Sequence, residues 1–270
     1  MEFIFYLAIG SVSGFCAGLF GIGGGLIIIP CLYFFFRYMH YPEQGIMHLA
    51  IGTALASIII SSLSSALAHH KKKAILWPIV KNFVPLMMLG SVLGAWIADQ
   101  LTSSVLQIVI GLFALWTAQK MFFTAKQVVV SQALPSAWQQ RSVAGLIGIA
   151  SAIFGIAGGS ITVPYLNRYG VVMQNAVATS AACGVPIAIM GAVGYLWFGS
   201  QQNLNLPQSI GYVHIWAFLG ISIASFLTAK LGVKVAHAIS AAKLKRYFAL
   251  ELVVVGIYFI YQALTALYLQ

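Results

Sequence analysis

The chain has 270 residues, of which 61% are hydrophobic and only 7% are charged, whereas a soluble domain carries about 25% charged residues. Four acidic side chains cannot keep a globule of this size in water, so a soluble fold is excluded and lipid is the expected solvent. The net charge of +10 does not indicate nucleic-acid binding, because the 14 Lys and Arg residues occupy short gaps between apolar runs.

The first charge-free run covers residues 3–36 and is too long for a single membrane helix. Its 34 residues would form a helix of about 51 Å, against a hydrocarbon core of about 30 Å. The run contains a glycine cluster at residues 21–25, here called the first elbow, and glycine is a poor helix former. We therefore expect two shorter helices, 3–20 and 26–37, joined at this elbow.

Later apolar runs predict the remaining helices of an all-α polytopic membrane protein. A first membrane repeat is expected over 1–126, a polar linker over 127–141 and a second membrane repeat over 142–270. The other helices expected in the first repeat are 45–68, 76–98 and 103–123. The helices expected in the second repeat are 142–154, 160–170, 174–198, 210–230 and 246–268.

The two halves repeat one another. Residues 14–32 (GFCAGLFGIGGGLIIIPCL) align without a gap on residues 148–166 (GIASAIFGIAGGSITVPYL), and nine of the 19 positions are identical. Chance apolar similarity would not keep several glycines and a proline in step. An internal duplication is therefore indicated, with a second elbow at residues 155–159.

The basic residues predict the topology. If the elbow segment of each half enters and leaves the membrane on one side, 13 of the 14 Lys and Arg residues share the cytoplasmic side, and only Arg37 lies opposite. Each half then crosses the membrane an odd number of times, so the halves are inverted relative to each other. Each would be a re-entrant or paired helix hairpin followed by three transmembrane helices. Both termini would be periplasmic or extracellular, in a multi-pass protein of a bacterial inner membrane.

The elbows are candidate anion-binding sites. The first amides of the helices that follow them have no intrahelical acceptor, and the helix dipole makes these helix starts positive. Glycine lets an anion approach the amides closely, so a small oxyanion is the expected ligand. The alternative is that the glycines only permit close helix packing. The substrate-binding residues expected at the elbows are Gly21, Gly23, Gly24, Gly25, Gly155, Gly158, Gly159 and Ser160.

Polar side chains on the next helix of each half extend this candidate site. Thr53 and Ser57 lie one turn apart, and Thr179 occupies the position that matches Thr53. Asn175 and Ser180 lie nearby, and hydroxyl and amide groups suit the oxygens of a sulfite or sulfonate. The alternative for each hydroxyl is a hydrogen bond back to its own helix.

Glu251 is the one carboxylate inside an apolar run and is a candidate for proton coupling. Its alternative role is an interfacial ion pair with Lys245 or Arg246. We recognise no nucleophile–base pair and no metal-ligand cluster in the sequence, so we expect no enzymatic activity, no cofactor and no metal.

Both elbows resemble the pattern of a known family. The segments GIGGGLIIIP at 21–30, FGIAGGSITVP at 154–164 and AVATS at 176–180 are similar to the signatures of the TauE/SafE membrane proteins, and the resemblance covers nearly the whole chain. It implies a secondary transporter of small sulfur-containing anions, such as sulfite and organosulfonates. With inverted halves, such a transporter would work by alternating access.

The partners implied are a small anionic substrate and the lipid bilayer, with no nucleic acid, and assembly into a homo-oligomer is left open. Two alternatives to a carrier also stay open, namely an anion-selective channel and a non-transporting membrane subunit.

Overall fold

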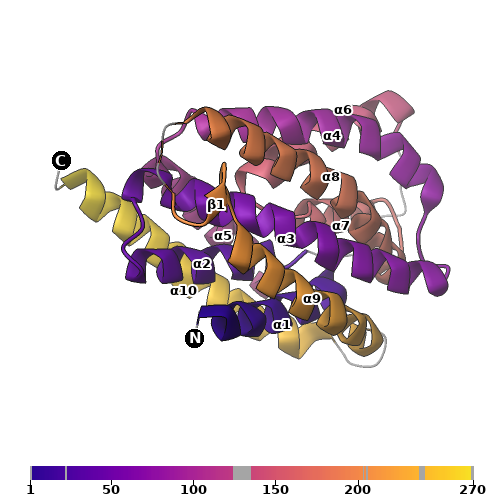
Figure 1. Cartoon of the computed structure of the whole chain (residues 1–270). Coiled ribbons are helices and arrows are strands. Elements are labelled where there is room, and N and C mark those ends of the chain that lie inside the picture. The colour runs from indigo at the N-terminus through magenta and orange to yellow at the C-terminus, as the bar shows by residue number, and fades with distance from the viewer. Residues whose placement is uncertain are drawn as a thin grey trace.

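The chain is almost entirely helical in the computed structural model, which describes residues 2–21, 23–123, 135–202, 204, 206–236 and 241–268 (Figure 1). The side chains of 121–123, 236, 241–248, 251 and 266–268 lie outside this description. The first half forms α1 (Glu2–Phe20), α2 (Gly25–Tyr38), α3 (Glu43–Lys71), α4 (Trp77–Asp99) and α5 (Ser103–Phe123). The second half forms α6 (Ala137–Ile153), α7 (Gly159–Arg168), α8 (Met173–Gln201), β1 (Ser209–Ile210), β2 (Val213–His214), α9 (Ile215–Ala236) and α10 (Ala241–Tyr268).

The helices have the lengths and surfaces that a bilayer requires. Among the described residues, five stretches are long and apolar enough to cross a membrane: α1, α3, α4, α8 and the Ile215–Val235 part of α9. Leu89 and Leu93 on α4, and Leu227 and Leu231 on α9, are each more than half exposed. Such apolar outer surfaces are stable in lipid, so the all-helical, multi-pass fold expected from the composition is confirmed.

Two polar ends of the bundle can be defined from α3. Arg37, near the end of α2, lies 3.9 Å from Glu43 in the first turn of α3, whereas Lys72 directly follows the last residue of α3. With 29 residues, α3 is about 43 Å long. Arg37 and Lys72 therefore lie at opposite ends of the molecule, here called the Arg37 end and the Lys72 end.

Exposed tryptophans lie near both of these ends. Trp77 and Trp138 are at the starts of α4 and α6, toward the Lys72 end. Trp96, Trp197 and Trp216 are near the end of α4, the end of α8 and the start of α9, toward the Arg37 end. Tryptophan is enriched at membrane–water interfaces, so the positions of these two groups of tryptophans match the two aromatic belts of a membrane protein.

The first elbow joins two antiparallel helices. Phe5, near the start of α1, stacks on Phe35, near the end of α2, with ring centroids 4.8 Å apart. Tyr6 packs edge-on against the same Phe35 ring at 5.2 Å. The α1–α2 hairpin is therefore open at the Arg37 end, and its elbow lies in the interior.

The second elbow joins a hairpin that faces the other way. Near the start of α6, Arg141 donates a 2.8 Å hydrogen bond to Asn82 in the second turn of α4. Near the end of α7, Tyr165 packs against Phe83 of the same α4 turn, with ring centroids 6.0 Å apart. The α6–α7 hairpin is therefore open at the Lys72 end.

The helices of one half pack on those of the other in matched pairs. The first helix of each half lies along the fourth helix of the other half, so α1 packs on α9 and α6 packs on α4 (Figure 1). The third helices, α3 and α8, pack on each other, as do the fifth helices, α5 and α10. Neither half therefore completes its packing alone.

Small residues allow these pairs to approach closely. Along one face of α1, a Cβ placed on Gly14 would lie 2.4 Å from Cα of Ser225, and one placed on Gly18 would lie 2.0 Å from the carbonyl oxygen of Ala229. On α6, a Cβ placed on Gly148 would lie 2.2 Å from the carbonyl oxygen of Met87. Van der Waals packing of small residues is a main source of helix association in lipid, where burial of apolar surface contributes little.

Some boundaries differ from those expected from the sequence. Helix α6 begins at Ala137, inside the stretch expected to be linker, because Ser136 and Gln139 form a capping box at its start. Residues 209–214, expected to begin a helix at 210, instead form the β1–β2 hairpin, and α9 runs over Ile215–Ala236. The turn of this hairpin contains Gly211 with a φ of 52°, which a helix cannot accommodate.

We expect Gly18→Ala to destabilise the protein by about 1–3 kcal/mol, because the added methyl group would overlap the backbone of α9. Gly145→Ala is the matched control, since a Cβ there would lie 3.7 Å from its nearest neighbour. That change should be neutral or stabilising by up to about 1 kcal/mol. Thermal unfolding in detergent measures both, and equal melting temperatures for the two variants would contradict the close α1–α9 contact.

Candidate functional site

Both elbows place a glycine in the left-handed conformation immediately before a helix. Gly24, the N-cap of α2, has φ 80° and ψ 0°, and Gly158, the N-cap of α7, has φ 75° and ψ −5°. Residues other than glycine reach this conformation only with strain. The duplicated glycines therefore start α2 and α7 with the same backbone geometry. Ile22, within the first elbow, lies outside the described residues.

These caps leave amides that the helices themselves do not use. In α2 the carbonyl of Gly24 first accepts from the amide of Ile27, and in α7 the carbonyl of Gly158 first accepts from the amide of Ile161. The amides that precede these bonds have no acceptor within their own helix and carry the positive end of its dipole. They belong to Gly25, Leu26, Gly159 and Ser160.

The two elbows touch each other in the interior. A Cβ placed on Gly25 would lie 1.9 Å from the carbonyl oxygen of Gly155, and one placed on Gly23 would lie 2.5 Å from Cβ of Ala157. The described residues of both elbows are buried. Close packing, the alternative role for these glycines, is thus present in the structure. The same contact brings the starts of α2 and α7 together, while anion binding there stays a prediction.

Serines of α3 lie beside the first elbow. Ser61 donates a 3.2 Å hydrogen bond to the carbonyl oxygen of Gly23. Ser57 instead donates to the carbonyl oxygen of Thr53, one turn back, at 2.9 Å. Ser57 therefore has the own-helix bond that was its alternative role, and Ser61, which was not singled out from the sequence, supports the elbow.

The other predicted ligands differ in their placement. The Oγ atoms of Ser160 and Ser180 are buried without a hydrogen-bond partner among the described residues, and their contact with a ligand stays a prediction. Asn175 is half-buried in the first turn of α8, and its role as a ligand stays a prediction. The side chain of Glu251 lies outside the described residues, so its role in proton coupling stays a prediction.

The duplicated threonines connect the two halves. Thr53 Oγ1 on α3 accepts a 2.9 Å hydrogen bond from the amide of His214, immediately before α9. Thr179 Oγ1 on α8 accepts a 3.1 Å bond from the amide of Leu76, immediately before α4. Each half therefore supplies the hydroxyl that supports the start of the fourth helix of the other half.

His214 adds a second cap at the start of α9. Its Nδ1 accepts a 3.1 Å hydrogen bond from the amide of Ala217, and its Nε2 lies 3.1 Å from the Tyr41 hydroxyl. Burial lowers the pKa of His214 to about 4. The imidazole is therefore neutral near pH 7, and its Nδ1 lone pair remains free to cap the helix.

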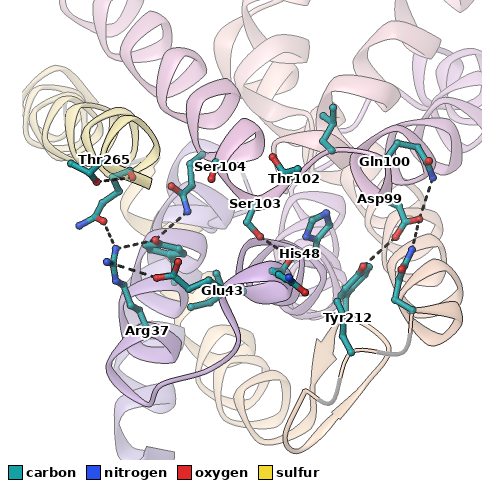
Figure 2. Close-up of a pocket in the computed structure, with 18 residues that line it drawn as sticks. Arg37, Glu43, His48, Asp99, Gln100, Thr102, Ser103, Ser104, Tyr212 and Thr265 are labelled. Atoms are coloured by element: carbon teal, nitrogen blue, oxygen red, sulfur yellow. Dashed lines mark hydrogen bonds and ion pairs between the residues drawn. The ribbon is translucent and has the colours of Figure 1, made fainter. Parts of the chain in front are cut away.

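A polar chamber of about 700 Å³ lies at the Arg37 end, between the ends of α2, α4, α8 and α10 and the starts of α3 and α5 (Figure 2). Charged side chains in its wall are Arg37, Glu43 and Asp99. The chamber was not predicted from the sequence, because its polar groups come from several helix ends that are far apart along the chain. The sequence feature that could have indicated it is the presence of His48 and Gln107, two polar residues inside apolar runs.

The Arg37 side of this chamber is a hydrogen-bonded network. The Arg37 guanidinium donates to the Tyr33 hydroxyl at 3.3 Å and to the side-chain oxygen of Gln262 on α10. Gln107 on α5 donates to the same Tyr33 hydroxyl at 3.1 Å, while its own Oε1 is buried without a partner in the described part of the chain. This network joins α2, α5 and α10 at the wall of the chamber.

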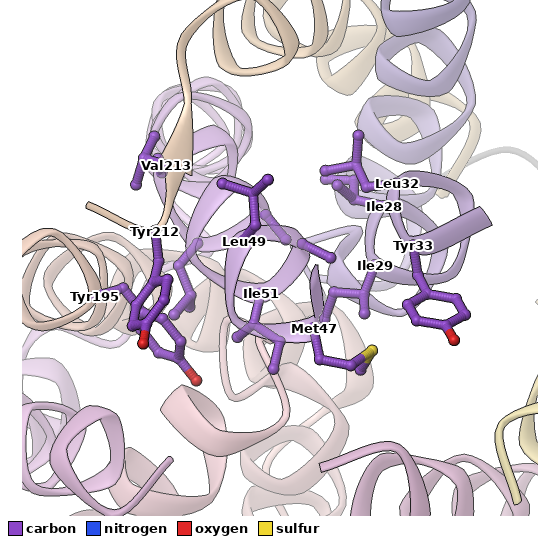
Figure 3. Close-up of a cluster of buried hydrophobic side chains, with 14 of the residues drawn as sticks. Ile28, Ile29, Leu32, Tyr33, Met47, Leu49, Ile51, Tyr195, Tyr212 and Val213 are labelled. Atoms are coloured by element: carbon purple, nitrogen blue, oxygen red, sulfur yellow. The ribbon is translucent and has the colours of Figure 1, made fainter. Parts of the chain in front are cut away.

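A hydrophobic layer separates the chamber from the elbows. Tyr212 lines the chamber, and its ring packs edge-on against that of Tyr195, 6.2 Å away. Tyr195 in turn donates to the carbonyl oxygen of Ala152, at the end of α6, and Ile51 packs directly on Gly155. Figure 3 shows Tyr195, Tyr212 and Ile51 within one buried cluster. This layer thus lies between the chamber and the elbows.

The lipid-compatible surface, the buried glycine helix starts and the polar chamber define a multi-pass membrane protein with polar groups arranged in its interior. The chain belongs to the sulfite exporter TauE/SafE family, whose model matches residues 6–259. The name of this family indicates a membrane transporter.

Curated relatives agree with this class. The chain is 36% identical to a probable membrane transporter protein of Haemophilus influenzae, over 93% of this chain and 95% of the relative. It is 28% identical to one of Methanocaldococcus jannaschii, over 93% of each chain, and 24% identical to one of Bacillus subtilis, over 98% and 99%. No solved structure matches the chain.

We expect Thr53→Val to destabilise the protein by about 1–3 kcal/mol, because it leaves the buried amide of His214 without an acceptor. Thr179→Val should cost less, since Leu76 is only partly buried. Thr53→Ser and Thr179→Ser keep the hydroxyl and serve as controls. Thermal unfolding in detergent measures the differences, and a Thr53→Val protein as stable as Thr53→Ser would contradict this role.

Proposed function

We propose that the protein is a secondary transporter of small sulfur-containing anions, of the sulfite and organosulfonate class. The observation that carries this proposal is the pair of glycine-capped helix starts that meet in the interior. Their unused amides offer hydrogen bonds and positive potential to an oxyanion without a buried Lys or Arg. The name of the family, sulfite exporter, supports this class of anion.

The elbows lie within the membrane in this proposal. Helix α2 has 14 residues and is about 21 Å long, and α7 has ten residues and is about 15 Å long. Both are shorter than the hydrocarbon core of about 30 Å. If the outer ends of the hairpins lie at the two interfaces, their tips lie near the midplane, where transporters of several folds bind substrate.

The two halves are inverted repeats in this proposal. Support comes from the hairpins, which open at opposite ends with their elbows in contact, and from the matched pairing of α1 with α9 and α6 with α4. Rocking of one half against the other exposes the elbow region first to one side and then to the other.

The anion enters from the Arg37 end through the polar chamber. The elbows are closely packed here, so the layer formed by Ile51, Tyr195 and Tyr212 and the contact between Gly25 and Gly155 both separate before the anion binds. The Lys72 end, which carries most of the basic residues, faces the cytoplasm in this proposal, and the membrane is a bacterial inner membrane. Both termini are then periplasmic or extracellular.

The decisive experiment measures flux in proteoliposomes with a panel of sulfite, organosulfonates, thiosulfate and simple carboxylates, with and without a pH gradient. We expect saturable flux of sulfite or a sulfonate. Gly25→Ala should reduce this flux about tenfold or more, because a methyl group beside the helix-start amides keeps the anion from approaching them closely enough to accept their hydrogen bonds. Gly145→Ala is the control and should retain wild-type flux.

Two outcomes would contradict this proposal. Flux that does not saturate, at rates far above carrier turnover and without coupling to pH, would indicate an anion-selective channel. Absence of flux for every anion in the panel would indicate a membrane subunit that transports nothing alone.

The topology is tested by cysteine labelling in cells, after Cys16, Cys31 and Cys183 have been replaced. A membrane-impermeant maleimide added outside should label Tyr38→Cys, which is exposed at the Arg37 end, and should leave Lys72→Cys unlabelled until the membrane is opened. Labelling of both cysteines from one side would contradict the proposed orientation.

A further inference from the structure

We infer that His48 binds the proton that accompanies the anion through the polar chamber, an inference that rests on the proposed transport function. His48 lies on α3, within an otherwise apolar stretch, and is only 3% exposed. It is nevertheless part of the chamber wall, where Figure 2 shows it between Ser103 and Tyr212. An ionisable residue buried in a membrane-spanning helix and facing a polar cavity is a functional candidate.

The hydrogen bonds of His48 determine which of its nitrogens can accept a proton. Nε2 lies 3.0 Å from the carbonyl oxygen of Ala98, and a carbonyl oxygen can only accept, so Nε2 carries the hydrogen. Neutral imidazole has one N–H, and Nδ1 therefore has a bare lone pair. This Nδ1 is buried without a hydrogen-bond partner among the described residues. Nδ1 is therefore the atom of His48 that can take up a proton.

Two groups on one face of the His48 ring would stabilise its charged, imidazolium form. Its ring stacks on that of Tyr212, with centroids 4.9 Å apart and planes 26° apart, and a cation over an aromatic face is stabilised. The Tyr212 hydroxyl donates to Asp99 Oδ1 at 3.2 Å, which places a carboxylate at the far edge of the same ring. The stacked ring and the carboxylate would both stabilise the imidazolium once a proton is bound.

The proton would also change the charge that an entering anion meets. The other charged groups of the described chamber wall are Arg37 on α2, Glu43 on α3 and Asp99 at the end of α4, while Tyr33 and Tyr212 are its titratable hydroxyls. With both carboxylates ionised, one negative charge is in excess. Transfer of one proton from water at the Arg37 end to Nδ1 neutralises this excess, and the repulsion of a monovalent anion is removed. Proton and anion are thus expected to bind together and to leave together.

The transport test uses His48→Gln, whose amide can still donate to the Ala98 carbonyl but cannot take up a proton. The probe is labelled methanesulfonate, because its own charge does not change over the pH range used. Wild-type flux in proteoliposomes with equal pH on both sides should rise up to about tenfold per unit of acidification, as one-site proton binding allows. For His48→Gln, the ratio of the fluxes measured one pH unit apart should fall to about one. His70→Gln, an exposed histidine at the far end of α3, is the control and should keep the wild-type ratio. A wild-type pH dependence in His48→Gln would overturn the inference.

A second readout does not depend on transport. The ¹⁵N NMR signals of the imidazoles are recorded for the full chain in nanodiscs, and those of His48 are assigned by their loss in His48→Gln. We expect a neutral form with the hydrogen on Nε2 at high pH, conversion to imidazolium on acidification, and a higher midpoint with methanesulfonate present. Signals that do not change from about pH 4.5 to about pH 8 would overturn the inference about His48. A wild-type protein that moves no anion would instead contradict the proposed function.

Discussion

Contact between two glycine elbows is the constraint on which the rest of this structure depends. The backbone of Gly25 lies so close to the carbonyl of Gly155 that no side chain fits between them. A polypeptide bends inside a membrane only where its polar backbone groups are buried in protein or line a cavity. Each elbow fulfils this condition by packing against the other, so the two bends are stable as a pair. The same contact brings two helix starts, whose first amides have no acceptor within their own helices, to one region of the interior.

The reciprocal packing of the halves follows from this arrangement. In each half, a threonine of the third helix, Thr53 or Thr179, accepts a hydrogen bond from the amide just before the fourth helix of the other half. Glycines on α1 and α6 bring these helices against α9 and α4. In the alternating-access cycle that we propose, matched contacts of this kind would let one set be exchanged for its equivalent with little change in energy.

The helices and the elbows could be predicted from the sequence, because both depend on local properties. An uncharged run longer than the bilayer must bend, and a glycine cluster shows where. The β1–β2 hairpin was missed because Ile210, Tyr212 and Val213 are as apolar as the helix that follows, and only Gly211 and His214 interrupt the apolar run before α9 begins at Ile215. The partners of Thr53 and Thr179 could not be predicted, because they depend on tertiary contacts between residues more than 100 positions apart. The chamber was missed for the same reason, since Arg37, Asp99 and Gln262 meet only in the folded chain.

The central claim is that the helix starts at the two elbows hold the anion. Crystals of the protein grown with selenite, a heavy analogue of sulfite, test it through the anomalous signal of selenium. We expect a peak at the elbows, with selenite oxygens at about 3 Å from amides such as those of Gly25 and Gly159. Ordered selenite in the chamber alone, in a protein whose elbows have parted, would contradict anion binding at the elbows.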